Sequence, residues 1–458
     1  MTLPRPQPRR RPRGVDGLTA LAGVGLGAIV AQWWVTKPAV DGGAETALAA
    51  GQLAGLVAAF LAMLGLLLAA RVPVLESTLG LDRLLRLHAR LGPWTLLTML
   101  THVGLITTAY AGLAGTGVVA QLWAIVTTYE WVALAAAGLL LMLVAGVATW
   151  WRVRWRLRYE AWWALHTSMY AGIALAVPHQ IANGAMFVGY PIAQWLWLGL
   201  YTLVLGALLA FRLGLPIART IRCGPRVASV VTEAPDVTSV IIEGDFARLP
   251  LAGGQFAHWR FLTRGLWWQA HPYSISGILD DGRLRITVRA VGDHSHALRR
   301  LAPGTRVFME GPYGAFTAQA REAGRPVALV AAGVGITPIR ALLEDLATDS
   351  MPAVVYRARD HDGLIFGDEL EEAVRARGGR LHCLVGDRAA QPVTATRLAA
   401  LVPDIADRTL YICGPPGFSA IVLSAARDLG IARHRIHIES FSIHAAGSSA
   451  PHRMALRP

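Results

Sequence analysis

The stretch HARLGPWTLLTMLTH, residues 88–102, begins and ends with histidine, and HTSMYAGIALAVPH, residues 166–179, does the same. Both stretches are apolar enough for membrane helices, where polar side chains are costly and tend to mark a functional site. Separations of 14 and 13 residues place the two histidines of each helix about 20 Å apart, toward the two faces of a hydrocarbon core about 30 Å thick. Two such helices can hold two stacked haems, each clamped by one histidine per helix. The pairs are His88 with His166 and His102 with His179.

Each of these histidines has a simpler alternative role, because a membrane histidine can also hydrogen-bond across a helix interface. The haem interpretation meets one geometric difficulty. Fourteen residues return His102 to within about 40° of His88 around the helix, whereas 13 residues leave His179 well away from the direction of His166. Pro178 precedes His179, and we expect the proline to distort the helix and re-aim this ligand.

Apolar residues are concentrated in the first half of the chain. The 458 residues are 54% hydrophobic, and six apolar stretches are long enough to cross a bilayer. These stretches cover 17–36, 46–70, 91–113, 127–149, 161–180 and 191–211. The basic start before an apolar run resembles a signal peptide, but the long apolar segment and the weak cleavage site favour a retained first helix.

Arginines predict the orientation of these stretches. They gather in the N-terminal segment, before the third stretch, between the fourth and fifth, and after the sixth, whereas the loops around 37–45, 112–126 and 181–190 hold almost none. The positive-inside rule therefore places both termini in the cytoplasm, with His88 and His166 toward the inner face of the cell membrane. The net charge of +13 then reflects arginines beside a lipid bilayer, and we expect no nucleic-acid partner.

The chain contains three cysteines, Cys223, Cys383 and Cys413, and none belongs to a Cys-x-x-Cys pair. This excludes a cysteine-ligated iron–sulfur cluster and a covalent haem attachment site within the chain. We therefore expect any haem to be a b-type haem that histidines hold without a covalent link.

Residues from about 218 to 318 predict a small antiparallel β-barrel, because short alternating strands are separated by Gly and Asp-Gly turns. The expected strands are Val227–Val231, Thr238–Glu243, Gln255–Leu262, Arg283–Val291 and Arg306–Glu310. Three motifs accompany them: HPYS at 271–274, RAVGDHS at 289–295 and GPYG at 311–314.

The residues that follow predict an α/β domain that binds a nucleotide. The buried run PVALV at 326–330 leads into AAGVGITP at 331–338 and then a helix to about Leu346. A strand, a glycine turn and a helix N-terminus form a phosphate site, because free backbone N–H groups and the helix dipole meet an anion there. Further strands, separated by helical stretches, are expected at Ala353–Tyr356, Arg380–Val385 and Thr409–Cys413. This βαβ layout indicates a parallel sheet.

These motifs resemble those of a known family. The soluble half resembles the ferredoxin–NADP reductase superfamily, and the chain from about residue 20 to Phe441 resembles the NADPH oxidase and ferric reductase group of transmembrane flavocytochromes. The resemblance implies an all-α six-helix transmembrane haem bundle, a cytoplasmic antiparallel β-barrel FAD domain and an α/β parallel-sheet NAD(P) domain. The expected boundaries are 1–16 for a basic cytoplasmic N-terminus, 17–215 for the haem bundle, 218–318 for the FAD domain, 319–441 for the NAD(P) domain and 442–458 for a disordered tail.

The resemblance also implies which residues hold the flavin. The HPYS motif, His271, Pro272, Tyr273 and Ser274, would bind FAD. Within it Tyr273 would pack against the isoalloxazine, and Ser274 would hydrogen-bond to it. The residues expected at the FAD pyrophosphate are Arg289, Gly292 and Ser295.

A second group of residues would bind the nicotinamide nucleotide. The nucleotide loop matches Gly333, Val334, Gly335, Thr337 and Pro338, and the segment beside the nicotinamide matches Cys413, Gly414 and Pro415. The expected catalytic residues are Cys413 and Phe441, of which Phe441 would cover the flavin ring. Arg357 follows a strand and either meets the 2′-phosphate that distinguishes NADPH from NADH or is an ordinary surface arginine.

Together these features predict an NAD(P)H-dependent oxidoreductase that passes electrons through FAD and two b-type haems to an acceptor on the outer face. The first candidate acceptor is O₂, which would leave as superoxide. A reductase of chelated ferric or cupric ions and an electron donor to a periplasmic protein are alternatives, and 112–128 offers no metal-ligand cluster that would decide. A further alternative is a membrane anchor without haem. We expect no obligatory protein partner.

Overall fold

The computed structural model describes residues 13–150, 157, 159–279, 281–387 and 389–440. The chain divides into two compact units, Met1–Leu213 and Gly214–Pro458. Several residues with expected roles fall outside the described residues. They are Phe441, the tail 442–458, the basic segment 1–12 and the arginines Arg152, Arg154, Arg156 and Arg158.

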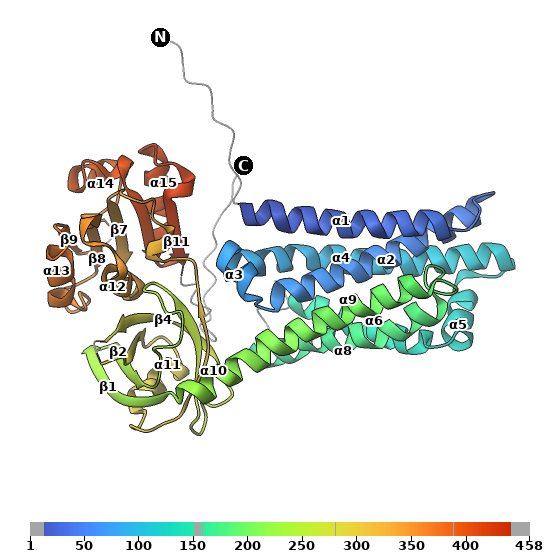
Figure 1. Ribbon diagram of the computed structural model, residues 1–458, viewed down its shortest axis with the longest axis horizontal. Helices are drawn as coiled ribbons and strands as arrows, with labels where there is room; N and C mark the ends of the chain where they lie inside the picture. The colour runs from blue at the N-terminus through green and yellow to red at the C-terminus, as the bar shows by residue number, and fades with distance from the viewer. Residues whose placement is uncertain (1–12, 151–156, 158, 280, 388, 441–458) are drawn as a thin grey trace, which may run out of the picture. The chain divides into compact units, whose positions relative to one another are not determined.

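The first unit is helical, and its long helices run alongside one another (Figure 1). The helices are α1 (Arg13–Thr36), α2 (Gly43–Ala69), α3 (Pro73–Leu79), α4 (Leu81–Ala114), α5 (Val118–Thr128), α6 (Val132–Thr149), α8 (Tyr159–Asn183) and α9 (Pro191–Leu208). A π-helical segment, Leu209–Gly214, follows α9 and leads into α10 (Leu215–Cys223). His88 and His102 lie on α4, and His166 and His179 lie on α8, which continues through Pro178.

Five helices of the described part of the chain are long and apolar enough to cross a membrane. These spans are Asp16–Thr36, Gly43–Ala69, Arg83–Ala114, Val132–Thr149 and Pro191–Cys223. Helix α8 is not among them. Many large apolar side chains of this unit are exposed, including Trp34, Trp195 and Ile192. A soluble unit would bury such side chains against its core, so this surface suits lipid.

Two details of the helical unit differ from the expectation. The segment around 112–126, expected as a loop, contains helix α5, whose 11 residues cover about 16 Å and cannot cross a hydrocarbon core. The next helix begins at Val132 instead of residue 127. Trp131 has a φ of 64°, a left-handed conformation that interrupts the helical run between α5 and α6.

Small residues let the helices approach closely. In α6 and α8 a Cβ at Gly138 would lie 2.5 Å from the carbonyl oxygen of Gly172, and one at Gly172 would lie 2.8 Å from the oxygen of Gly138. Helix α2 is the most buried helix of the unit, and many of its inward residues are alanine or glycine. Close backbone contact between small residues is the usual way that membrane helices pack.

The first domain of the second unit is a six-stranded antiparallel sheet in the order β1-β2-β5-β4-β3-β6. Its strands are β1 (Arg226–Ala234), β2 (Val237–Glu243), β3 (Phe256–Phe261), β4 (His271–Ile278), β5 (Leu284–Arg289) and β6 (Val307–Tyr313), and a short helix α11 (Asp293–Ala297) follows β5. The two ends of the order meet, because Val227 exchanges backbone hydrogen bonds with Thr305 and Gly304 beside β6. The expected strands are present, and β4 was missed because Pro272 and Gly277 interrupt its pattern.

The second domain of this unit contains the expected parallel sheet, with five strands in the order β11-β10-β7-β8-β9. The strands are β7 (Val327–Ala332), β8 (Ala353–Ala358), β9 (Arg380–Val385), β10 (Thr409–Gly414) and β11 (Ile436–Ser440). Helices α12 (Ile336–Asp345) and α13 (Gly367–Arg375) pack in one apolar cluster with the sheet, and α14 (Ala395–Leu401) and α15 (Pro416–Asp428) pack in the other. The sheet is therefore covered on both faces, as its continuous apolar strands require.

Candidate functional site

Two histidines from different helices face each other in the helical unit. The ring centres of His88 on α4 and His166 on α8 are 6.0 Å apart, and their planes are nearly perpendicular at 81°. A metal bound between two imidazoles, with metal–nitrogen bonds of about 2 Å each, holds the ring centres about 6 Å apart. The pair therefore has the separation that a bis-histidine metal requires. Trp162 stacks on the ring of His166, with centres 5.3 Å apart.

The hydrogen bonds of these rings leave the other nitrogen available. The Nδ1–H of His88 donates to the carbonyl oxygen of Gly65 on α2 at 2.9 Å, and Nδ1–H of His102 donates to the oxygen of Gly51 at 2.8 Å. With Nδ1 as the donor, Nε2 carries the lone pair that binds a metal. The histidines thus hydrogen-bond across a helix interface, and these bonds use Nδ1 and not Nε2.

The second pair is His102 and His179. Their side chains interact electrostatically, so the 13-residue spacing on α8 still brings His179 toward His102. In the described residues no group of three or more His, Cys, Asp or Glu side chains is placed to hold a metal ion. A metal at either pair therefore needs most of its ligands from elsewhere, and a haem supplies four nitrogens of its own. The separation of His88 and His166 therefore fits a bis-histidine haem at the first pair.

In the second unit the HPYS motif lies on β4 beside helix α11. His271 and His294 are in contact, with ring centres 3.8 Å apart, and the Tyr273 hydroxyl donates to Nδ1 of His294 at 3.0 Å. His294 is 8% exposed, and its Nε2 has no hydrogen-bond partner among the described residues. His294 lies inside the RAVGDHS motif, but the sequence alone predicted no role for it. Its position directly after Gly-Asp in the expected pyrophosphate motif was the available signal.

Burial fixes the protonation of this cluster. It lowers the pKa of His294 to about 3, with a smaller contribution from His271, and it also lowers the pKa of His271. Burial raises the pKa of the Tyr273 hydroxyl. All three side chains are therefore neutral near pH 7. Ser274 is buried, and its hydroxyl oxygen has no partner among the described residues, which fits its expected hydrogen bond to a flavin.

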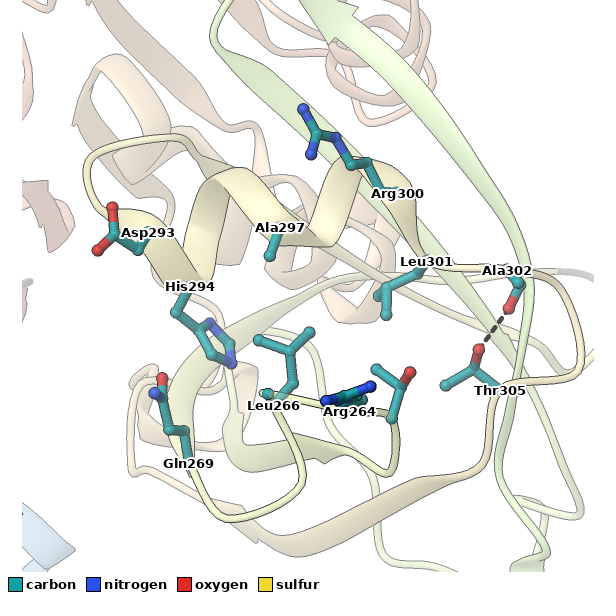
Figure 2. Close-up of a pocket in the computed structure, with 12 residues that line it drawn as sticks. Arg264, Leu266, Gln269, Asp293, His294, Ala297, Arg300, Leu301, Ala302 and Thr305 are labelled. Carbon is teal, nitrogen blue, oxygen red and sulfur yellow. Dashed lines mark hydrogen bonds between the residues drawn. The ribbon is translucent and has the colours of Figure 1, made fainter.

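A cavity of about 450 Å³ adjoins this cluster. Figure 2 shows His294 descending from α11 toward Leu266 and Gln269, with Arg264 and Arg300 on the lining. Gln269 also approaches His271, with its Oε1 3.3 Å from Nε2. Arg264 and a buried imidazole with an unused nitrogen suit an anionic ligand such as a diphosphate, whereas the Arg300 guanidinium points away from the other lining side chains and Asp293 adds a carboxylate to the lining (Figure 2).

The expected pyrophosphate residues lie around the start of α11. The Ser295 hydroxyl accepts hydrogen bonds from the backbone N–H groups of Val291 and Gly292, at 2.9 and 3.0 Å, so it shapes the turn. Arg289 donates from Nε to Asp236 at 2.7 Å. A Cβ added to Gly333 would lie 3.5 Å from the Arg289 guanidinium. Arg289 therefore lies between the flavin domain and the expected nucleotide loop.

The nucleotide loop has the predicted strand, turn and helix. Gly333 has a φ of 54°, which favours glycine, and α12 begins at Ile336. Gly335 is needed for packing within the protein, because its Cβ would meet the carbonyl oxygen of Cys413 at the end of β10. The Thr337 hydroxyl donates to the oxygen of Val334 at 2.9 Å, so it stabilises the turn.

The remaining expected residues lie at the carboxyl ends of the parallel strands. Cys413 is fully buried, and burial raises the pKa of its thiol well above the usual value, so the thiol stays protonated. Pro415 follows at an exposed position. Arg357 on β8 pairs in register with Ala332, directly before the glycine turn, so it can reach a nucleotide bound there. Its guanidinium points to the carbonyl oxygen of Gly386 at 3.5 Å.

Three parts of the chain match known protein families. Residues 54–177 match the family described as "Ferric reductase like transmembrane component". Residues 223–317 match an FAD-binding domain, and residues 329–423 match the oxidoreductase NAD-binding domain. The first match includes His88, His102 and His166 and ends two residues before His179.

Relatives match only part of the chain. The flavohemoprotein of Vibrio cholerae is 34% identical over 192 residues, covering 39% of this chain and 48% of that protein. The ferredoxin reductase component of 3-ketosteroid-9-alpha-monooxygenase from Mycobacterium tuberculosis is 32% identical over 202 residues, covering 42% and 56%. The chain thus spans about half the length of these curated relatives. The crystal structure of the FAD/NAD-binding domain of nitric oxide dioxygenase from Vibrio cholerae matches at 27% identity and a TM-score of 0.42, covering 48% of this chain and 99% of that chain.

The buried histidine cluster predicts how stability depends on pH. The folded chain keeps His294 neutral down to about pH 3, whereas an unfolded histidine is protonated below about pH 6.5. The unfolded state then binds more protons, so stability falls as the pH falls from 6.5 toward 3. His294→Gln keeps an acceptor for Tyr273 without titrating. It should reduce the acid-induced drop in the unfolding temperature of the second unit, followed in the full-length protein.

His296→Gln is the matched control, because His296 is exposed on the same helix. It should leave the pH dependence unchanged. Equal pH dependence in His294→Gln and the unaltered protein would show that His294 is not the buried titrating group.

Gly335→Ala should separate the nucleotide turn from the end of β10. Its Cβ would meet backbone atoms of Cys413 and Gly414, which cannot move aside as a flexible side chain can. Overpacking of this kind costs about 1–3 kcal/mol, so we expect lower stability together with a higher KM for NAD(P)H in flavin reduction. Gly367→Ala has no atom within 4 Å of the new Cβ and should change neither value. Unaltered KM and stability in Gly335→Ala would contradict the packing role.

Proposed function

Because the chain has the ferric reductase and NADPH oxidase type of architecture, a ferric reductase-like transmembrane domain joined to FAD-binding and NAD-binding domains, we propose that this NAD(P)H-dependent oxidoreductase carries electrons across a cell membrane. NADPH or NADH donates at the cytoplasmic side, and an acceptor takes electrons on the outer side. The observation that carries the proposal is the facing pair His88 and His166 on α4 and α8, with His102 and His179 farther along the same two helices.

The four histidines are the proposed ligands of two b-type haems. His88 and His166 would hold one, and His102 and His179 the other. When bound, FAD accepts a hydride as two electrons, and the haems carry electrons singly. The chain's part is to fix the ring orientations. It does so through the hydrogen bonds from Nδ1 of His88 and His102 to the backbone of α2, which leave each Nε2 free to bind iron.

The proposed flavin site uses the HPYS motif and α11. Tyr273 would lie against the isoalloxazine, held by its hydrogen bond to His294, and the unpartnered Ser274 hydroxyl would bind the ring's polar edge. The cavity beside His294 would take the diphosphate half of FAD, since Arg264 and the unused Nε2 of His294 line it.

The proposed nucleotide site is the turn Gly333–Gly335 with the N-terminus of α12, where Cys413 and Pro415 approach from β10. Arg357 lies one strand away from the turn and offers a cation to a 2′-phosphate, which favours NADPH over NADH. Phe441, the expected cover of the flavin ring, lies outside the described residues.

The proposal also includes six membrane crossings, with α8 as the fifth in chain order, and a closed flavin-domain barrel. Support for the extra crossing comes from the backbone contact of α8 with α6 at Gly138 and Gly172. Arg83, Arg86 and Arg90 lie at the start of α4, which favours that end as the cytoplasmic one and His88 as the inner ligand. Both termini would then lie in the cytoplasm. The protein would be embedded in the plasma membrane, and it would need no obligatory protein partner.

We propose O₂ as the acceptor. The reaction then balances: one NAD(P)H and two O₂ give NAD(P)⁺, H⁺ and two superoxide ions. Because two histidines would hold each haem, the acceptor would take its electron without binding to the iron. A second candidate is chelated ferric or cupric ion, and the match to the ferric reductase family favours it. Transfer to a periplasmic protein is a third possibility that no feature of the described residues supports.

The acceptor is decided by following NADPH oxidation in the purified protein loaded with haem and FAD, with superoxide and ferric reduction assayed in parallel. Two superoxide ions per NADPH, lost when oxygen is removed, support the oxidase. Fast anaerobic reduction of chelated iron, with only slow transfer to oxygen, would replace the oxidase with a metal reductase.

His102→Ala should remove the outer haem because that iron loses one of its two protein ligands. The haem-to-FAD ratio should fall from two toward one, while NAD(P)H still reduces the flavin at the original rate. His361→Ala, at an exposed histidine of the second unit, should keep both haems. Full occupancy of both haems in His102→Ala would contradict the ligand assignment.

A further inference from the structure

Helix α2 offers two backbone acceptors to the histidines of α4, and the two occur in register. Gly65 accepts from His88 and Gly51 accepts from His102, so the glycines and the histidines are both separated by 14 residues in antiparallel helices. Over 14 residues both helices advance by about 21 Å. One α2 backbone therefore holds one ligand of each pair in the same way.

A third glycine of α2 provides the space for this contact. A Cβ at Gly55 would lie 2.6 Å from Nδ1 of His102, closer than real contacts allow. At the other pair the space is wider, since a Cβ at Gly65 would lie 3.8 Å from Nδ1 of His88. The two histidines thus make equivalent hydrogen bonds to α2, and the ring of His102 in addition lies directly against Gly55.

The ligands from α8 differ in their polar contacts. His166 donates from Nδ1 to the Thr149 hydroxyl at 3.3 Å, and that hydroxyl donates in turn to the carbonyl oxygen of Ala145 at 2.7 Å. Nδ1 of His179 makes no hydrogen bond of ordinary geometry to the described residues, and its polar neighbour is the carbonyl of Ala176 in its own helix. The pair His88–His166 therefore has two Nδ1 hydrogen bonds of ordinary geometry, whereas the pair His102–His179 has one such bond and a poorer contact with the carbonyl of Ala176.

An acceptor on Nδ1 makes the imidazole a stronger donor to its metal, which stabilises the oxidised iron and lowers its reduction potential. We propose that Thr149 acts as a positioning residue that lowers the potential of the inner haem relative to the outer one, and that α2 contributes equally to both. The unequal contacts then favour electron transfer from the inner to the outer site. This inference rests on the proposed haem function.

One opposing effect comes from charge. Arg86 and Arg90 flank His88, and positive charge near an iron raises its potential. Both arginines are exposed, so solvent and salt screen their effect. A test that changes Thr149 alone keeps these charges constant and isolates the hydrogen bond.

Thr149→Val removes the hydroxyl and nearly preserves the side-chain shape. In the full-length protein reconstituted in lipid, a spectroelectrochemical titration of the haem absorption bands should show the lower of the two potentials moving upward, with the higher one unchanged. Both haems should remain at full occupancy with low-spin spectra. Thr167→Val is the matched control, because the Thr167 hydroxyl bonds only to backbone of its own helix and should shift neither potential.

Gly55→Ala tests the contact with α2. The new Cβ should displace His102, and weakening of a ligand's support typically lowers metal affinity about 10- to 100-fold, so the outer haem alone should be lost or become high-spin. Gly104→Ala on α4, whose Cβ would have no atom within 4 Å, is the control. Unshifted potentials in Thr149→Val with both haems bound would overturn this inference and leave the proposed function standing. An unaltered protein that binds no haem would overturn both.

Discussion

The approach of α4 to the backbone of α2 is the constraint on which the helical unit depends. A histidine inside a membrane needs a partner for its N–H, and the carbonyls of Gly51 and Gly65 supply it only because glycine and alanine bring the two helices close. The same bonds decide which ring nitrogen faces the opposite helix. The same contacts therefore determine both the packing of the two helices and the orientation of the histidine rings, and a larger residue at Gly55 would disturb both.

Close backbone approach also governs the second unit. Gly335 lies against the carbonyl of Cys413, so the glycine turn after β7 packs on the end of β10 without a bound nucleotide. In the flavin domain, buried neutral side chains hold the local geometry. There His294 accepts a hydrogen bond from the Tyr273 hydroxyl and packs on His271. In both places the chain holds the geometry, and the chemistry is left to the groups that the site would bind.

Much of this arrangement could be predicted from the sequence, because periodicity and spacing report on a residue's own element. The histidine spacing predicted facing pairs, and the run from Val327 through Gly335 predicted a strand, a turn and a helix. Contacts between elements were missed. Gly51 and Gly65 look like ordinary small residues until α4 lies beside them, and His294 gains its role only when β4 reaches it. Gly335 was expected in the nucleotide loop, and the structure adds its close contact with the backbone of Cys413.

Transport of electrons across the bilayer is the central claim, and sealed proteoliposomes test it most directly. The protein is reconstituted with a membrane-impermeant, one-electron acceptor trapped inside, and NADPH is added outside, where it reaches the molecules whose soluble unit faces outward. The account predicts that the trapped acceptor is reduced at a rate tied to NADPH oxidation. Rapid flavin reduction with an unreduced trapped acceptor would contradict it, because electrons would then stop on the side where they entered.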